Sequence, residues 1–328
     1  SSPIFMEVGL TNKCNMSCFW CITENGRDNK AGAQIDIAAL KKFLNEFSAE
    51  GGKAVTYAGQ GEPTFYPHFK EAVLSAKEAD LQLGMMTNGV YKKSYNSLIG
   101  ESFEWIRISL DTLDEVSYKE WKKVNGVAII KKNIQALKHY PVKVGVNCNV
   151  GPNITIDHAK QLVHWATDNT AVDYLQFRPI LPRHYKEAET CYKKTGVTEI
   201  NAEVWEFLDK HTINPKINLS DDKRLDLKDG TAFNFRSCEG HFFEPILAAT
   251  GEVKVCTYHP LDRRLTFGNI YDSSFKDIWH SDQRKKAIEF VRSIDYKSKC
   301  QMCCKLAEPN KLLDFLKHPE ECKDINFL

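Results

Sequence analysis

The sequence predicts an α/β fold, a partial (β/α)6 barrel of parallel strands followed by a small cysteine-rich domain. Three observations lead to this prediction. Strand-like and helix-like segments alternate through residues 1–182, a more polar stretch follows in 183–236, and six of the eleven cysteines lie in 237–328. Alternation of this kind is typical of a parallel sheet, because parallel neighbours need a long crossover. Six strands are too few to close an eight-stranded barrel, so we expect an open one.

Six runs of apolar and β-branched residues are the expected strands. They lie at residues 4–10, 53–58, 81–86, 105–110, 142–150 and 172–180. Helical periodicity separates most of them; in residues 37–47 apolar side chains recur at i, i+3, i+4 and i+7, and Asp36 can cap the first turn. Ligands of such folds bind beyond the carboxyl ends of the strands, so the residues that follow each strand are the candidates for function.

The pattern changes after residue 182. Residues 183–236 are rich in turn signals, which indicates a connector with one or two helices. Further on, two β-prone runs at 245–249 and 252–256 flank Gly251 and predict a hairpin, and one helical stretch is expected over 274–293.

Composition limits the classes of partner. The 44 Lys and Arg residues nearly balance 43 Asp and Glu residues, so overall charge favours neither nucleic acid nor an anionic membrane. No apolar run is long enough to span a bilayer, and the first residues do not resemble a secretory signal, so we expect a cytoplasmic protein. In a reducing compartment, closely spaced cysteines favour metal ligation over disulfides.

Three cysteines share one short loop after the first expected strand. Cys14, Cys18 and Cys21 can bind three irons of a [4Fe–4S] cluster and leave the fourth iron open. The alternative is a zinc site, but zinc usually takes two CxxC-like pairs, and none is nearby. The spacing CxxxCxxC, with Trp20 before the last cysteine, resembles the radical S-adenosylmethionine (SAM) superfamily.

The resemblance continues after the second expected strand, at Gly59-Gln60-Gly61-Glu62-Pro63. This segment is similar to the family's Gly-Gly-Glu motif, although Gln60 replaces the middle glycine. The motif implies that the loop backbone and the Glu62 carboxylate hold the ammonium group of SAM, a charge-assisted contact. The alternative is an ordinary glycine turn at a strand end.

The family also implies SAM contacts at later strands. The residues concerned are Trp20 and Phe177 beside the adenine, Asn147 and Asn149 at the ribose, and Ser109 and Asp111 at the mouth of the barrel. Each of them could instead make a local bond in a turn or pack in the core.

A second cysteine group, formed by Cys238, Cys256, Cys300 and Cys303, resembles the twitch domain, the shortened SPASM extension of radical SAM enzymes. Four thiolates would fully ligate one auxiliary [4Fe–4S] cluster. A structural zinc bound by the same four cysteines is the alternative. Only Cys304 and Cys322 remain in this region; these, like Cys148 and Cys191, are expected to be small buried residues, and ligation of a cluster by Cys304 or Cys322 is the alternative that the sequence leaves open.

The two resemblances together imply an enzyme with a radical SAM barrel in 1–182, a helical connector in 183–236 and an auxiliary-cluster domain in 237–328. Such an enzyme cleaves SAM to methionine and a 5′-deoxyadenosyl radical, which takes hydrogen from an unactivated carbon. A small polar substrate of the sugar or aminocyclitol type is expected. Dehydrogenation follows if the auxiliary cluster accepts an electron, and epimerisation follows if a thiol such as Cys191 returns hydrogen.

Arg178 and His259 are candidates to anchor or deprotonate that substrate. Several dehydrogenating relatives carry an acidic residue directly after the cysteine matched by Cys256, and Thr257 stands there instead. A ribosomally made peptide is an alternative substrate, and a non-catalytic iron–sulfur electron carrier or regulator is the alternative of another class. An external one-electron reductant such as flavodoxin or ferredoxin is the implied partner.

Overall fold

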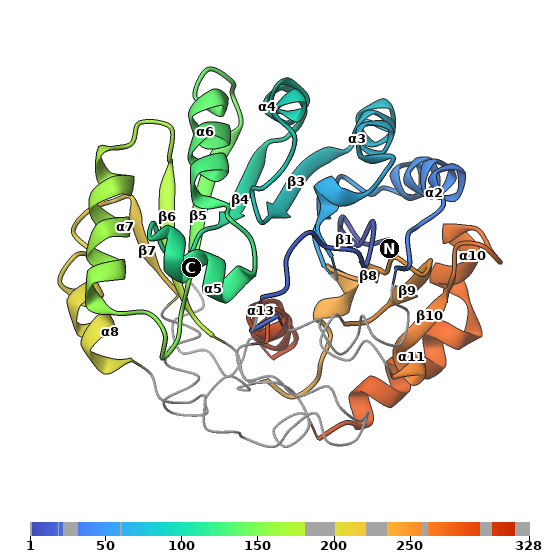
Figure 1. The fold of residues 1–328 in the computed structure, drawn as a ribbon. Coiled ribbons are helices and arrows are strands. Elements are labelled where there is room, and N and C mark those ends of the chain that lie inside the picture. Colours follow the sequence, from blue (N-terminus) through green and yellow to red (C-terminus); the bar gives the residue numbers. More distant parts are fainter. Residues whose placement is uncertain are drawn as a thin grey trace.

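In the computed structural model, residues 2–18, 20–21, 32–59, 61–180, 201–220, 235–256, 262–295 and 304–318 are described. One sheet of ten strands, in the order β10-β9-β8-β1-β2-β3-β4-β5-β6-β7, runs through the molecule (Figure 1). Its parallel part consists of β1 (Phe5–Val8), β2 (Ala54–Tyr57), β3 (Gln82–Thr87), β4 (Trp105–Ser109), β5 (Lys143–Val150), β6 (Tyr174–Pro179) and β7 (Ile217–Leu219). The predicted partial barrel is confirmed.

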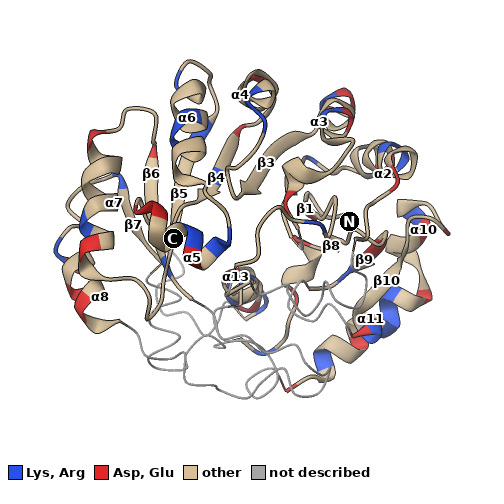
Figure 2. Cartoon of the chain, in the orientation of Figure 1, with Lys and Arg blue, Asp and Glu red and all other residues tan. Residues whose placement is uncertain are grey.

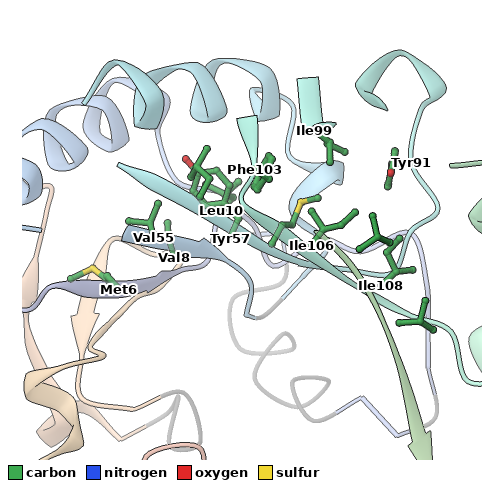
Figure 3. Close-up of a cluster of buried hydrophobic side chains, with 14 of the residues drawn as sticks. Met6, Val8, Leu10, Val55, Tyr57, Tyr91, Ile99, Phe103, Ile106 and Ile108 are labelled. Carbon is green, nitrogen blue, oxygen red and sulfur yellow. The ribbon is translucent and has the colours of Figure 1, made fainter. Parts of the chain in front are cut away.

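Helices cover the outer face of the curved sheet (Figure 1). They are α2 (Ile37–Ala49), α3 (Phe69–Glu78), α4 (Asn96–Ser102), α6 (Val127–Leu137), α7 (Ile156–Asp168) and α8 (Ala202–Asp209), whereas α5 (Glu115–Lys122) lies inside the curve, at the ends of the strands. Strand alternation sorts the side chains: Ile106 and Ile108 of β4 are fully buried in the apolar cluster of Figure 3, whereas Arg107 between them is partly exposed. The inner face of the sheet is therefore the one available to ligands.

Two short helices escaped prediction. Both α4 and α5 are too short to show two turns of apolar periodicity, and α4 contains Gly100, a poor helix former. Gly100 is explained by packing, because a Cβ atom there would lie 2.2 Å from the ring of Tyr140. The helix with the Asp36 cap is confirmed, since the Asp36 side chain accepts a hydrogen bond from the amide of Ala39.

The stretch predicted as a connector also adds a strand to the sheet. Strand β7 pairs in parallel with β6, and α8 precedes it in the chain. Three residues are too few to reveal a period of two, which is why the sequence pattern did not indicate this seventh parallel strand.

The cysteine-rich region continues the same sheet. The predicted hairpin is present as β8 (Ile246–Leu247) and β9 (Glu252–Lys254), and β10 (Thr266–Asn269) extends it. Strand β8 pairs in parallel with β1. The helices are α10 (Phe275–His280), α11 (Asp282–Ser293) and α13 (Ala307–Lys317). The single helix expected over 274–293 is broken at Ser281, whose hydroxyl caps α11 through the amide of Arg284.

Short 3₁₀ turns occur at η1 (Pro63–Phe65), η2 (Lys93–Tyr95), η4 (Gly240–Phe242) and η5 (Arg263–Leu265). Among the residues described, no helix is both long and apolar enough to cross a membrane.

Candidate functional site

The loop that leaves β1 carries the first three cysteines. Cys14, Cys18 and Cys21 are partly exposed, while Met16 and Trp20 between them are 6% and 8% exposed and pack into the core. The loop is thus anchored by its apolar side chains and keeps its thiols near the surface. Within the described ranges, no group of three His, Cys, Asp or Glu side chains is gathered as around a single metal ion. The donor set suits a cubane cluster, in which each thiolate binds a different iron.

The Gly59–Pro63 segment packs directly on this loop. The amide of Glu62 donates to the carbonyl of Lys13 (2.9 Å). Gly61 lies so close that a Cβ atom would stand 2.4 Å from the carbonyl oxygens of Lys13 and Thr11. Gly59 has a φ of +106°, which favours glycine. Both glycines are therefore required by the backbone.

The Glu62 carboxylate is buried and hydrogen-bonded on both oxygens. Its Oε1 accepts from the amide (3.1 Å) and hydroxyl (2.7 Å) of Thr64 and from the hydroxyl of Thr87 (2.7 Å). Its Oε2 accepts from the amide of Asn88 (2.8 Å). Burial raises the pKa of Glu62 and these hydrogen bonds oppose the shift. A carboxylate has about four acceptor positions, so Oε2 retains capacity for a further donor.

Asn88 joins the carboxylate to the first cysteine. Its side-chain amide lies 3.8 Å from Cys14 Sγ and donates to the side chain of Asn15 (2.7 Å). Thr87 and Asn88 follow the third expected strand, but the sequence did not predict either of them as a site residue. The position beyond a parallel strand was the signal that could have found them.

Ser109, the last residue of β4, and Asp111, just beyond it, contact a buried lysine that the sequence did not indicate as a site residue. Lys122 of α5 forms an ion pair with Asp111, lies 3.5 Å from the Ser109 hydroxyl and stands 4.6 Å from the ring centre of Trp20. The two charged side chains are 3% and 0% exposed. Burial acts to lower the pKa of Lys122, but the charge and hydrogen bond of Asp111, together with the thiols of Cys18 and Cys148, outweigh it, so the pKa is raised. In the sequence, the position of Lys122 directly after an apolar residue, Trp121, was only a weak sign that the lysine is buried.

Asp111 also binds the next strand. Its Oδ1 accepts from the amide (2.7 Å) and the side chain (2.9 Å) of Asn149. Asn147, two residues earlier on β5, donates to Asn149 Oδ1 (3.3 Å). The oxygen of the Asn147 side chain is buried and has no hydrogen-bond partner among the described residues. It is an acceptor in need of a donor at the mouth of the barrel.

Two predicted residues of β6 face opposite sides of the sheet. Arg178 is partly exposed and pairs in register with Asn149 of β5, on the inner face. The side chain of Phe177 is fully buried in the apolar core on the helix-covered face, so only its backbone can face a ligand. Deeper on the inner face, Arg107 donates to the side chain of Gln176 (3.1 Å).

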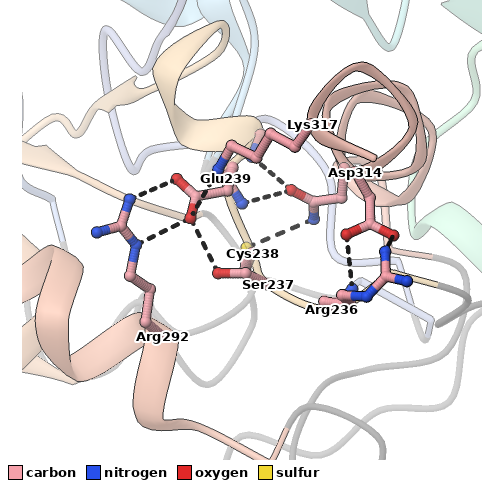
Figure 4. A network of polar contacts seen from close by, with 9 residues as sticks. Arg236, Ser237, Cys238, Glu239, Arg292, Asp314 and Lys317 are labelled. Atoms are coloured by element: carbon pink, nitrogen blue, oxygen red, sulfur yellow. Dashed lines mark hydrogen bonds and ion pairs between the residues drawn. The ribbon is translucent and has the colours of Figure 1, made fainter. Parts of the chain in front are cut away.

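The second cysteine group includes a member that was not expected. Cys238 and Cys256 were predicted; Cys304 is half-buried beside them, and desolvation and the nearby thiols of Cys256 and Cys238 raise the pKa of its thiol. Burial raises the pKa of Cys238 to about 12. Asn310 of α13 donates to Cys238 Sγ (3.5 Å) and accepts from the amide of Glu239 (2.6 Å) (Figure 4).

Ion pairs hold this region in place. Arg292 of α11 binds the Glu239 carboxylate with two nitrogens, at 2.8 and 3.0 Å (Figure 4). The ammonium of Lys305, which follows Cys304 directly, pairs with Glu7 of β1 (2.7 Å) and Glu244 (3.0 Å). The second cysteine group is therefore bound to the strand that leads into the first one.

Four predicted site residues, Cys191, His259, Cys300 and Cys303, lie outside the described residues, as do Gln60, Thr257 and Cys322.

Comparison with known families decides the identity. The family model for the radical SAM superfamily matches residues 8–166, and that for the SPASM iron–sulfur cluster-binding domain matches residues 238–304. The chain belongs to the radical SAM superfamily. It is a radical SAM enzyme with a C-terminal SPASM or twitch-like cluster domain, and these domains imply a SAM-binding [4Fe–4S] cluster and an auxiliary cluster.

The curated relatives include GTP 3′,8-cyclases. The chain is 29% identical over 154 residues to a probable GTP 3′,8-cyclase of Pyrococcus horikoshii, covering 45% of this chain and 48% of the relative. It is 28% identical over 131 residues to one of Methanococcus maripaludis, with coverages of 39% and 43%. The chain thus spans about half the length of these relatives or less.

Solved structures share the fold. SuiB of Streptococcus suis, bound to precursor peptide SuiA, has a TM-score of 0.68 at 17% identity over 94% of this chain and 71% of that chain. The enzyme anSMEcpe with bound AdoMet has a TM-score of 0.66 at 14% identity over 99% of both chains. Barrel and cluster domain therefore occur together in these proteins as they do here.

Proposed function

We propose that this chain abstracts hydrogen from a carbon of a small polar molecule of the sugar or aminocyclitol type, and that it dehydrogenates or epimerises that molecule. The observation that carries the proposal is the convergence of Cys14, Glu62 and Asn88 at the ends of β1, β2 and β3. Asn88 contacts both the cysteine loop, at Cys14, and the carboxylate of Glu62. That carboxylate retains an acceptor position. A non-catalytic electron carrier has no need of the carboxylate.

The first cluster is assigned to Cys14, Cys18 and Cys21. When bound there, it supplies the electron that cleaves SAM to methionine and the 5′-deoxyadenosyl radical. Glu62 Oε2 binds the SAM ammonium, since it is the oxygen with remaining acceptor capacity. The Asn147 side chain, with its unused acceptor, binds a ribose hydroxyl. Asp111 is used by Lys122 and Asn149, so its role is to hold the strand ends.

The auxiliary cluster is assigned to Cys238, Cys256 and Cys304, with Cys300 or Cys303 completing the set. The proximity of the first three thiols supports this assignment. A zinc ion on the same cysteines is the rival, and it could not accept an electron. Measured iron and sulfide separate the two assignments, because two cubanes require about eight irons per chain.

The substrate is assigned to the inner face of the sheet, between the two cysteine groups. Partly exposed polar side chains line this face, among them Arg107, Gln176 and Arg178. The relatives named as GTP cyclases support a small substrate that contains a sugar. A peptide is the second candidate, favoured by the likeness in fold to SuiB, whose structure holds a precursor peptide.

The reaction balances in two ways. In dehydrogenation, one electron from an external protein reductant and one SAM give methionine and 5′-deoxyadenosine, and the substrate radical loses a proton and an electron, the latter to the auxiliary cluster. In epimerisation, a thiol, for which Cys191 is the candidate, returns a hydrogen atom to the radical, and the thiyl radical left behind is restored by a second electron from the external reductant and a proton from water. Arg178 anchors the substrate, and His259 is the candidate base.

The test is anaerobic reconstitution, reduction with dithionite and measurement of 5′-deoxyadenosine formed from SAM. Formation of 5′-deoxyadenosine is expected, and its absence from a protein with full iron content would overturn the enzyme assignment. Deuterated sugars, aminocyclitols and peptides then identify the substrate by deuterium transfer into 5′-deoxyadenosine. Transfer from peptides alone would exclude the small-molecule assignment.

A further inference from the structure

The outer side of the cysteine loop meets the segment that follows β3. The side chain of Asn15, next to Cys14, donates to the carbonyl of Val90 (2.8 Å). The exposed side chains of Lys92 and Lys93 follow two and three residues later. Lys92 and Lys93 therefore lie a few residues from a carbonyl that the residue next to Cys14 contacts.

The same loop also contacts the end of α5. The amide of Ser17 donates to the carbonyl of Lys122 (3.1 Å), the last residue of that helix. Lys123, the next residue, is exposed and has a φ of +65°, so the chain reverses here. The cysteine loop is thus bracketed by two lysine-bearing segments.

Helix α6 adds further lysines beside the first segment. The buried side chain of Asn133 donates to the carbonyls of Gly89 (3.0 Å) and Tyr91 (3.2 Å), which fixes α6 to the segment after β3. Between them lies a hollow of about 520 Å³. Its lining includes Tyr91, Lys93, Ile129, Lys131 and Lys132. Ile129, one of the lining residues, is 41% exposed.

We call Lys92, Lys93, Lys123, Lys131 and Lys132 the basic rim. In the part of the chain that the structure describes, no member of the basic rim forms an ion pair. Glu115 at the start of α5 accepts from the amide of Ala128, and Glu120 is exposed on the same helix. The lysine positions of α5 and α6 are coloured blue in Figure 2.

We propose that the basic rim is the docking surface for an acidic protein that carries one electron, which it passes to the cluster held by the Cys14 loop. The inference rests on the proposed function, because only a reductive cleavage needs such a partner. The step balances as a transfer of one electron, with the carrier oxidised and the cluster reduced. An exposed apolar side chain, Ile129, that shares a hollow with lysines outside any ion pair suits a transient protein interface.

Contacts of the Asn15 side chain connect the segment that bears Lys92 and Lys93 to the cysteine loop. From Val90 the route to the cluster ligand is short, because the Asn15 side chain that donates to the Val90 carbonyl also lies 4.0 Å from Cys14 Sγ. Opposite charge on the two partners speeds their encounter, and salt screens it over about 10 Å at 0.1 M. Reduction by the carrier should therefore depend strongly on ionic strength.

The experiment uses the reconstituted full chain and reduced flavodoxin, an acidic carrier, as the probe. The second-order rate of flavodoxin oxidation is measured by stopped flow for the wild type, for Lys93→Glu/Lys131→Glu/Lys132→Glu and for a control. The control, Lys41→Glu/Lys70→Glu/Lys77→Glu, changes net charge equally on exposed positions of α2 and α3. We expect the rim variant to be slower by about tenfold or more and the control to change less than about twofold.

Dithionite separates this proposal from the proposed function. Because dithionite is small and needs no docking surface, all three proteins should form 5′-deoxyadenosine equally fast with it. No product with dithionite in any of them would defeat the proposed function itself. Normal dithionite activity together with equal flavodoxin rates in the rim and control variants would overturn the docking surface alone. Loss of dithionite activity in the rim variant only would equally overturn it, since the lysines would then serve SAM chemistry.

Discussion

Replacing Glu62 by glutamine tests the central assignment of the site. One oxygen becomes an amide group, so a donor would face either the amide of Asn88 or the donors of Thr64 and Thr87. Losing one hydrogen bond to a charged group costs about 2 kcal/mol of unfolding free energy. Unfolding entropy for 328 residues is about 0.7 kcal/mol per degree, so the melting temperature should fall by about 3 °C.

Thr87→Val is the matched control, because it also removes one hydrogen bond to Glu62 but keeps the charge. Both variants should therefore melt a few degrees lower. Only Glu62→Gln should weaken SAM binding, by about 10- to 150-fold, the equivalent of about 1.5–3 kcal/mol for a charge-assisted contact. Calorimetric titration of SAM into the reconstituted proteins measures this. Equal affinities of the two variants would refute the assignment of Glu62 to the SAM ammonium.

Three further outcomes are expected. Lys122→Met leaves the Asp111 carboxylate buried and unpaired, so unfolding free energy should fall by about 3–5 kcal/mol, and adding Asp111→Asn should recover about 2 kcal/mol of it in denaturant titrations. Cys304→Ala should lower bound iron from about eight to about four per chain, whereas Cys148→Ala, in the barrel core, should not; equal iron content would remove Cys304 from the ligand set. Burial lowers the pKa of His241 to about 4, so the unfolded chain binds a proton between pH 6.5 and 4 that the folded chain does not, and stability should fall as pH falls through that window. His241→Phe should flatten this slope in melting curves measured from pH 7 to 4.

Much of the barrel followed from the sequence because its strands and longer helices repeat a clear period. All six predicted strands of the barrel are present, and the Asp36 cap is where the chain chemistry placed it. What the pattern could not supply was short structure, since α5 and β7 offer too few residues to show a period. The β8–β1 pairing was also beyond reach, because it joins segments from opposite ends of the chain.

Some residues of the candidate site could also be predicted from the sequence, and others could not. Glu62 could be found from the sequence because it belongs to a short motif, in which the residue types at neighbouring positions are characteristic of the family. Lys122, Asn88 and Cys304 act through contacts that form only after folding, so their neighbours in the chain gave at most a weak signal of their role. Phe177 illustrates the opposite case. It lies near the end of a strand, as predicted, but the alternation of side chains along the strand directs its ring into the core.

The pairing of β1 with β8 also has a consequence for how the protein is made. Strand β1 emerges early from the ribosome, yet one of its edges gains its partner only when Ile246 and Leu247 have been synthesised. Until then the barrel has an unpaired edge beside a loop of reactive thiols, a combination that favours aggregation and oxidation. Contacts between distant segments also fold slowly. We therefore expect insertion of the clusters only after β8 has been synthesised, when both edges of β1 are covered.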